Sequence, residues 1–404
     1  MLDIWPELPI YLHAYDHPDK KARGDVVAAL KLNHRVSRIY FDKTSDSSWE
    51  IFVPLMQHPF PALTHLRVKP YCLIQNAISH SFLGGSAPCL QDLLLTGLPF
   101  PALPELLLSA TSLICLRYCD IPPSGYISPQ AMVTGLSALI RLESLSLTFR
   151  SPQSLPDRAI RISPPHMRTL LPALTYLRYQ GVPQYMEDLV AQIDAPLLES
   201  VVITFSHQEV LEVSQLEKFV RRADKLSLLD RAQVTFWDDY ISVTLSEELV
   251  AERVDPKTLK LTLACRERVL QVSYLAQFCA SCLPTLSPFE CLDILHSYDC
   301  TWAWEDVIDP SPQWLELLRL FNTVKDLRIH KFVASRIAQS LRGLPVERVT
   351  EVLPALENVF ISKLDPFFGP VMEAISEFAD MRQLSGHPVS IYYQEERGFI
   401  KVGS

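Results

Sequence analysis

A short hydrophobic pattern recurs along the whole chain, and it limits the possible folds more than any other feature. At Leu113, Leu116 and Tyr118, apolar residues stand at the first, fourth and sixth positions of the pattern. The same spacing occurs at Leu63/Leu66/Val68, Leu90/Leu93/Leu95, Leu142/Leu145/Leu147, Leu174/Leu177/Tyr179, Leu198/Val201/Ile203, Val324/Leu327/Ile329 and Leu356/Val359/Ile361. An early copy is Val36/Ile39/Phe41, and weaker ones are Leu229/Ala232/Val234, Leu259/Leu261/Leu263 and Phe289/Leu292/Ile294. The copies that begin at Val36 and Leu356 are eleven intervals apart, so the mean repeat is about 29 residues.

The period and length of this repeat indicate a fold class. The last two apolar positions of each copy are two residues apart, which is the period of a strand with one buried face. A Leu-x-x-Leu-x-Leu core at this repeat length is typical of leucine-rich repeats. We therefore predict an α/β leucine-rich-repeat solenoid, curved, with parallel strands on the concave face and helices or loops on the convex face.

Proline separates the expected helices from the strands that follow them. Pro-Ala-Leu occurs at 61–63, 172–174 and 354–356, and variants of it occur at 87–90 and 195–198. Proline cannot continue a helix and favours extended backbone before it, so each copy ends one element and starts the next. Helices are expected at 20–33, 49–56, 104–110, 128–139, 185–193, 211–222, 269–282, 313–321, 336–341 and 370–378.

Two stretches depart from the repeat. Residues 151–165 form a proline-rich insertion, and residues 222–254 are irregular, with a predicted hairpin that pairs 232–236 with 240–245. A final strand is expected at 389–393. The predicted organisation is an N-terminal capping segment and helix at 1–34, an irregular repeat domain at 35–394 and a charged C-terminal tail at 395–404.

Composition and charge narrow the function classes. The formal net charge is −9 and the sequence pI is about 5.7, which argues against general nucleic-acid binding. No apolar stretch is long enough for a membrane helix, and the acidic, proline-broken start predicts no secretory leader. Nine cysteines in this context suggest reduced thiols, so we expect the protein in the cytoplasm, the nucleus or both.

Three stretches carry a resemblance to a known family. They are LDIWPELPI at 2–10, PALTHLR at 61–67 and LDRA at 229–232. Together with the repeats, they make the chain resemble fungal F-box proteins with irregular leucine-rich repeats. The resemblance implies a substrate receptor of a cullin–RING ubiquitin ligase, in which an F-box helix bundle binds the ligase adaptor and the repeats bind the substrate.

The chain departs from that family in two respects. Leu8 and Pro9 are followed by Ile10-Tyr11-Leu12 and not by the Leu-Pro-x-Glu start of an F-box, so we expect adaptor binding only if an F-box is present upstream. Regular cytosolic repeats also carry Asn or Cys at the ninth position, where it bonds the turn leaving the strand. Here that position holds Tyr71, Leu98, Ile121, Arg150, Val182 and Leu364, so the turns must be satisfied by other groups.

The alternative to a ubiquitin-ligase substrate receptor is a repeat scaffold or regulator unrelated to ubiquitin.

Basic side chains recur at the position between the last two apolar residues of the pattern. That position points outward from the sheet, and arginine occupies it in alternate repeats, at Arg67, Arg117 and Arg178, and again at Arg328. Lys69 and His330 lie two residues beyond, on the same face. Such a row would attract a protein partner with an acidic or phosphorylated peptide, whereas the simpler interpretation is an ordinary solvated surface.

No pattern predicts an enzyme, a cofactor or a metal site. Cys279 and Cys282 have zinc-like spacing, with Cys291 and Cys300 further on, but they sit among apolar residues and are expected to pack in the core. His13 and His17 are four residues apart without a third ligand. Tryptophans at 302, 304 and 314 lie near acidic residues, and we interpret them as buried structural side chains.

Overall fold

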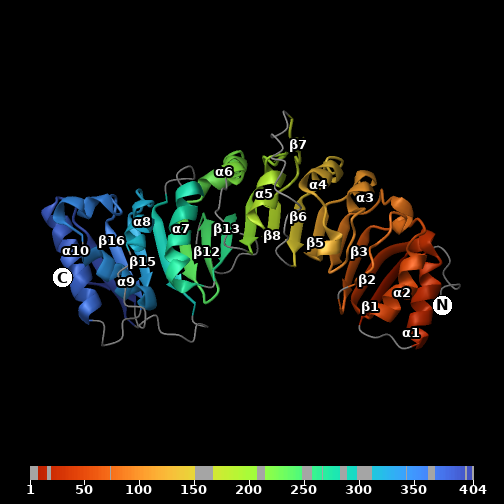
Figure 1. Cartoon of the computed structure of the whole chain (residues 1–404), viewed down its shortest axis with the longest axis horizontal. Helices are drawn as coiled ribbons and strands as arrows, with labels where there is room; N and C mark the ends of the chain where they lie inside the picture. Colours follow the sequence, from red (N-terminus) through yellow and green to blue (C-terminus); the bar gives the residue numbers. More distant parts are fainter. Residues whose placement is uncertain are drawn as a thin grey trace. The chain divides into compact units, whose positions relative to one another are not determined.

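The computed structural model describes residues 8–15, 20–72, 74–150, 167–206, 214–247, 257–265, 267–282, 289–297, 312–342, 344–362, 369–395 and 398–402 (Figure 1). The chain divides into two compact units. Unit 1 comprises residues 1–201 and 218–224, and unit 2 comprises residues 202–217 and 225–404. Strand β10 (Ser200–Phe205) and helix α6 (Ser214–Arg221) each contain a boundary between the units, and the units are described separately below.

Unit 1 contains a sheet of parallel strands in sequence order. Each strand pairs with the next along the chain, as the repeat predicts. The strands are β1 (Ile10–Tyr15), β2 (Val36–Thr44), β3 (His65–Pro70), β4 (Asp92–Thr96), β5 (Cys115–Ile121), β6 (Ser144–Phe149) and β8 (Tyr176–Gly181). A separate two-stranded parallel sheet joins β7 (Thr169–Leu170) to β9 (Ile193–Asp194).

Helices connect consecutive strands of unit 1. They are α1 (Lys20–Leu30), α2 (Asp46–Leu55), α3 (Leu103–Ser109), α4 (Pro129–Leu136) and α5 (Pro183–Val190), with 3₁₀ turns at η1 (Asn33–Arg35), η2 (Phe82–Gly85) and η3 (Pro123–Gly125). Helices α3, α4 and α5 pack side by side, and a Cβ on Gly135 would lie 2.8 Å from Pro104 Cα. The predicted alternation of strand and helix is confirmed for the connections that contain these five helices, whereas β3 is followed by η2 before β4.

The repeated apolar positions form the core. Leu66, Leu93, Leu116, Leu145 and Leu177 are in register on adjacent strands, and all have 0% exposure. A row of backbone hydrogen bonds repeats at the same period. In each repeat, the N–H of the second pattern position donates to the carbonyl of that position in the preceding repeat. This ladder runs through Ser37, Thr64, Gln91, Ile114, Glu143, Thr175 and Glu199 at 2.8–2.9 Å. The pattern therefore sets both the buried row and the register.

Side chains other than asparagine satisfy the turns in this fold. The buried Tyr118 hydroxyl donates to Leu98 O at 2.9 Å and accepts from the Phe100 N–H at 3.0 Å, so it bonds the turn that leaves β4. In unit 2 the Gln271 amide donates to Trp237 O at 3.0 Å and Cys265 O at 3.2 Å. The expectation that other groups satisfy the turns is confirmed for the turn at Leu98.

Unit 2 contains parallel strands together with an antiparallel insertion. Its strand order is β13 (Thr258–Ala264), β12 (Tyr240–Ser246), β11 (Arg231–Phe236), β14 (Cys291–His296), β15 (Asp326–His330), β16 (Asn358–Ser362), β17 (Ser390–Glu395) and β18 (Gly398–Lys401). Its helices are α7 (Arg268–Cys282), α8 (Gln313–Arg319), α9 (Lys331–Arg342) and α10 (Gly369–Leu384), with η4 (Asp224–Leu228) and η7 (Val346–Glu351). Helix α9 begins directly after β15, earlier than predicted.

The insertion corrects one part of the predicted fold. The hairpin at β11 and β12 is confirmed, but β12 is antiparallel to both β11 and β13, so an all-parallel sheet is wrong for this stretch. Only Trp237, Asp238 and Asp239 separate β11 from β12, and so short a connection permits only an antiparallel pair. The backbone ladder accordingly passes from Asp230 directly to Glu290, which leaves the Leu259 copy outside the repeat. Residues 398–401, within the predicted tail, form β18, which is antiparallel to β17.

Candidate functional site

The outward face of the unit 1 sheet brings three of the predicted arginines into one row. Strand pairing aligns His13, Tyr40, Arg67, Leu94, Arg117, Ser146 and Arg178 on adjacent strands. Arg67, Arg117 and Arg178 thus lie on alternate strands, as predicted, and adjacent strands are about 4.8 Å apart. Arginines on alternate strands are therefore separated by about 10 Å at the backbone.

A second outward row lies two residues earlier on each strand. It contains Tyr11, Arg38, His65, Asp92, Cys115, Ser144 and Tyr176. The two rows together contain four arginines, Arg38, Arg67, Arg117 and Arg178, and one carboxylate, Asp92, which contacts Arg67 and Arg117. These rows are therefore basic on a chain whose formal net charge is −9.

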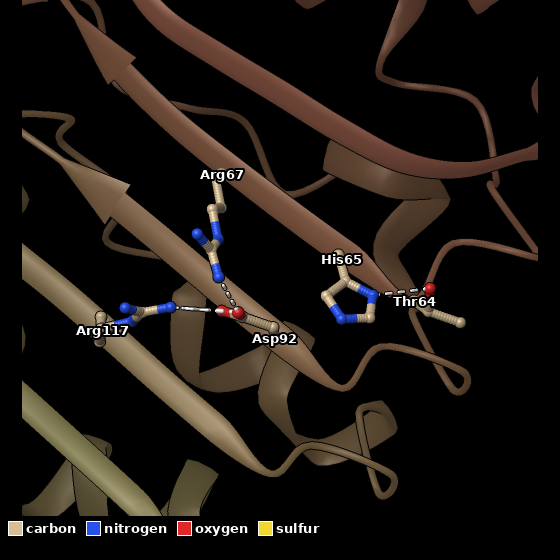
Figure 2. Close-up of polar contacts among 5 residues, drawn as sticks. All are labelled: Thr64, His65, Arg67, Asp92 and Arg117. Atoms are coloured by element: carbon tan, nitrogen blue, oxygen red, sulfur yellow. Dashed lines mark hydrogen bonds and ion pairs between the residues drawn. The ribbon is translucent and has the colours of Figure 1, made fainter. Parts of the chain in front are cut away.

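Asp92 joins two of the arginines, as Figure 2 shows. Arg67 Nη2 donates to Asp92 Oδ2 at 2.7 Å from β3, and Arg117 Nη2 donates to Oδ1 at 3.0 Å from β5. The Asp92 side chain is 13% exposed, whereas the side chains of Arg67 and Arg117 are 45% and 32% exposed. The carboxylate therefore lies near the sheet, and the two guanidinium groups converge above it.

Aromatic rings support the cations at the N-terminal end of the face. The guanidinium of Arg67 lies over the Tyr40 ring at 5.3 Å, and that of Arg38 lies over Tyr11 at 5.2 Å. Tyr11 is 64% exposed. Exposed tyrosine and arginine side chains are among those that contribute most to protein–protein interfaces.

His65 adds no positive charge to this face at pH 7. Burial lowers its pKa from 6.5, the nearby Arg38 charge lowers it further, and Asp92 only partly opposes this. Its Nδ1 lies 2.8 Å from Thr64 Oγ1, and Figure 2 shows the ring turned toward that hydroxyl. The imidazole is therefore neutral between Arg38 and Asp92.

Two predicted site residues of unit 1 have no ion pair within the described residues. Arg178 is exposed on β8 and Lys69 is exposed on β3. The Arg178 charge is available to a ligand, whereas Lys69 is aligned with Asp42 on β2, and the charges of Arg67 and Arg117 are partly compensated by Asp92.

The other two predicted site residues belong to unit 2 and have a different environment. The Arg328 side chain lies over the Phe360 ring at 5.5 Å, and its Nε is 3.9 Å from Asp293 Oδ1. His330 points to the same side of the sheet but is only 6% exposed. Burial raises the pKa of the Asp293 carboxyl, and the Arg328 and Arg231 charges oppose that rise. The local charges here are therefore mixed.

The sequence interpretation missed Asp92, because it followed only one of the two outward positions. The other outward position lies two residues before Arg67, Leu94 and Arg117. In these three repeats it holds His65, Asp92 and Cys115. That second reading would have placed a carboxylate between two arginines. It would also have shown that the row is not uniformly basic.

The cysteines show no ligand geometry in the described part of the chain. Cys279 is fully buried in α7, and burial raises the pKa of its thiol well above the ordinary value. Burial also raises the pKa of Cys291 on β14, to about 11. The side chain of Cys282, and residues Cys300 and His17, lie outside what is described. Among described residues, no group of three or more His, Cys, Asp or Glu side chains could hold a metal ion.

Of the three tryptophans interpreted as structural residues, the structure describes Trp314. Trp314 is 1% exposed and packs against Phe236 at 5.5 Å, so its interpretation as a structural residue is confirmed. The tryptophans at 302 and 304 lie outside the described residues.

No helix in the described ranges has the length and apolar composition that crossing a membrane requires.

Comparison with known proteins gives little further information. No family model matches the chain, and no curated protein matches it. Among solved structures, the leucine-rich repeat-containing protein LegL7 from Legionella pneumophila aligns over 94% of this chain and 98% of its own, with 12% identity and a TM-score of 0.29. The fold assignment rests on the strand pairing and the backbone ladder of this chain, because a likeness of that size carries no weight.

Proposed function

We propose that the chain is a leucine-rich-repeat solenoid that binds another protein through the outward sheet face of unit 1 and has no catalytic role. The observation that carries the proposal is the pair of in-register rows, which contain four arginines and one carboxylate on a chain with a net negative charge. Parallel repeats present such rows on a rigid sheet, where a partner can bind across several strands.

The chemistry of the face favours an acidic partner segment. Guanidinium groups bind carboxylates and phosphates through paired, charge-assisted hydrogen bonds. Arg117 and Arg178 are separated by one strand, so acidic groups spaced along an extended segment can reach both. Tyr11 and Tyr40 supply flat apolar surface beside the cations, which suits a peptide with hydrophobic side chains near its acids.

The test compares two sets of variants with equal changes in charge. Arg67→Gln/Arg117→Gln/Arg178→Gln removes the row. Arg319→Gln/Arg342→Gln/Arg348→Gln removes three arginines that form ion pairs in unit 2, of which Arg342 and Arg348 are exposed and Arg319 is half-buried. A partner identified by affinity capture should bind the first variant at least about tenfold more weakly than wild type, and the second within about twofold. Equal affinities for all three proteins would show that binding does not use this face.

A more specific proposal follows from the resemblance to F-box proteins with irregular leucine-rich repeats. In that role the partner is a ubiquitination substrate, and the protein acts in the cytoplasm or nucleus. Copurification of the captured partner with a ligase adaptor and cullin would support it, and imaging of the tagged protein would test the compartment. A partner recovered with no ligase component would favour a scaffold unrelated to ubiquitin.

A further inference from the structure

The Arg67–Asp92–Arg117 cluster contains a negative charge at the centre of the proposed acid-binding face. Asp92 accepts hydrogen bonds from both arginines, at 2.7 Å from Arg67 and at 3.0 and 3.1 Å from Arg117. Each arginine comes from a separate neighbouring strand, and each is 25 residues away in sequence. A partner's acid that binds these guanidinium groups must therefore bind close to Asp92.

The two guanidinium groups keep donors for such an acid. Only Nη2 of each is hydrogen-bonded within the described residues, and the buried Nε of Arg117 has no partner there. Arg67 and Arg117 are more exposed than Asp92, so their remaining N–H groups, apart from the buried Nε of Arg117, can meet a ligand from the solvent side. The carboxylate below occupies part of their bonding capacity and compensates one of their two charges.

From this geometry we infer that Asp92 is an internal counterion that limits the affinity of the face for acidic groups. The inference rests on the proposed function and adds a specificity-determining residue to it. Asp92 holds the two arginines in a fixed convergent arrangement, and its charge repels the acid that they attract. A partner with a single carboxylate is bound weakly at this cluster, and several acids or a more highly charged group are needed for tight binding.

The opposing effects of Asp92 can be separated by one substitution. In Asp92→Asn, an amide oxygen at the place of Oδ2 can still accept from both Arg67 and Arg117, which lie 2.7 and 3.1 Å from that atom, while the amide nitrogen takes the place of Oδ1 and the negative charge is removed. The inference predicts a gain in affinity for acidic ligands, and a larger gain for a ligand of higher charge, because the removed repulsion scales with ligand charge. A purely structural role for Asp92 predicts a loss and no dependence on ligand charge.

The probes are three fluorescein-labelled dodecapeptides that differ at two central positions, which hold glutamate, phosphoserine or glutamine. The carboxylate and phosphate arms distinguish the two sources of acidic groups, and the glutamine peptide reports binding that does not depend on acid. Fluorescence anisotropy would be measured with the full chain at two salt concentrations. Glu290→Gln is the matched control, since Glu290 forms an exposed ion pair with Lys325 in unit 2 at 2.9 Å.

Asp92→Asn should bind the glutamate peptide about tenfold more tightly than wild type, with a greater gain for the phosphoserine peptide and a steeper loss on adding salt. Glu290→Gln should remain within about twofold of wild type for both peptides. Binding seen only with Asp92→Asn would also support the inference, because the counterion then suppresses binding in the wild type.

The outcomes separate the two proposals. If Arg67→Gln/Arg117→Gln weakens binding but Asp92→Asn does not strengthen it, the counterion role is wrong and the acid-binding face stands. If the arginine variant binds the acidic peptides as wild type does, the acid-binding face is wrong, and the counterion role fails with it. Failure of every variant to bind either acidic peptide would overturn both. A gain with Asp92→Asn for the glutamine peptide as well would show that the effect is not electrostatic.

Discussion

Tyr118→Phe tests whether tyrosine replaces the asparagine of regular repeats. The Tyr118 side chain lies in the core at 0% exposure, and its hydroxyl is bonded to Leu98 O at 2.9 Å and to the Phe100 N–H at 3.0 Å. Gly125 lies beside it, because a Cβ at that position would be 2.7 Å from the hydroxyl. Phenylalanine fills nearly the same volume, so the substitution removes these two bonds and a longer contact to Gly125 O at 3.3 Å, and little packing.

The cost follows from the two backbone groups that lose their partner. Leu98 and Phe100 are 0% and 1% exposed, so water does not readily replace the hydroxyl. An unpaired buried polar group costs about 1–3 kcal/mol, so two such groups give an expected loss of about 2–6 kcal/mol in the free energy of unfolding. Urea unfolding monitored by circular dichroism measures the loss, and hydrogen exchange at the Phe100 amide measures it locally.

Tyr126→Phe provides the matched control. Tyr126 is half-buried, and its hydroxyl makes no hydrogen bond with a described residue, so this variant should stay within about 0.5 kcal/mol of wild type. The reasoning would be refuted if the two variants were equally stable and the Phe100 amide kept its protection in Tyr118→Phe. That result would mean that another group satisfies the turn.

Two further predictions concern packing and pH. Gly135→Ala should destabilise the protein by about 1–3 kcal/mol, because the new Cβ would lie 2.8 Å from Pro104 Cα. Gly24→Ala, whose Cβ would meet nothing within 4 Å, should stabilise α1 by about 0.5–1 kcal/mol. Thermal unfolding of both variants measures the opposite signs. Burial raises the pKa of Tyr118 to about 12 and also raises the pKa of Tyr185. The stability that the neutral hydroxyls contribute is therefore complete below pH 10 and should be lost as pH rises toward 12. Urea unfolding at several pH values should show a smaller loss in Tyr118→Phe than in wild type.

The sequence was sufficient to predict the repeated elements. A leucine at 66, 93, 116, 145 or 177 has the same surroundings in each repeat, since its neighbours are the equivalent residues of adjacent strands. The apolar period therefore encodes the buried row directly. Proline before the strands at 63, 174 and 356 sets the element boundaries by local backbone chemistry, which also needs no tertiary information.

The place of β13 in the sheet was harder to predict than the hairpin before it. Leu259, Leu261 and Leu263 alternate as a repeat strand does, so they predict a strand but not its neighbours. Because β13 pairs with β12, the strand order is β13-β12-β11-β14 and does not follow the sequence. Strand β18 was missed because Gly398–Lys401 is only four residues long and its two apolar residues, Phe399 and Ile400, are adjacent and do not alternate.

The outward face shows why its chemistry is less predictable than its core. A core position accepts only apolar side chains of limited volume, so each repeat carries the same information there. An outward position tolerates any polar or aromatic residue, and its electrostatic character depends on which residue stands beside it on the next strand. Arg67 and Asp92 are 25 residues apart in sequence and 2.7 Å apart in space. Their pairing can be derived from sequence only after the register of the repeats is known, and a one-residue error in register would move Asp92 to the opposite side of the sheet. Binding specificity in such a protein is thus encoded in comparisons between repeats, at a fixed separation, and not within any single motif.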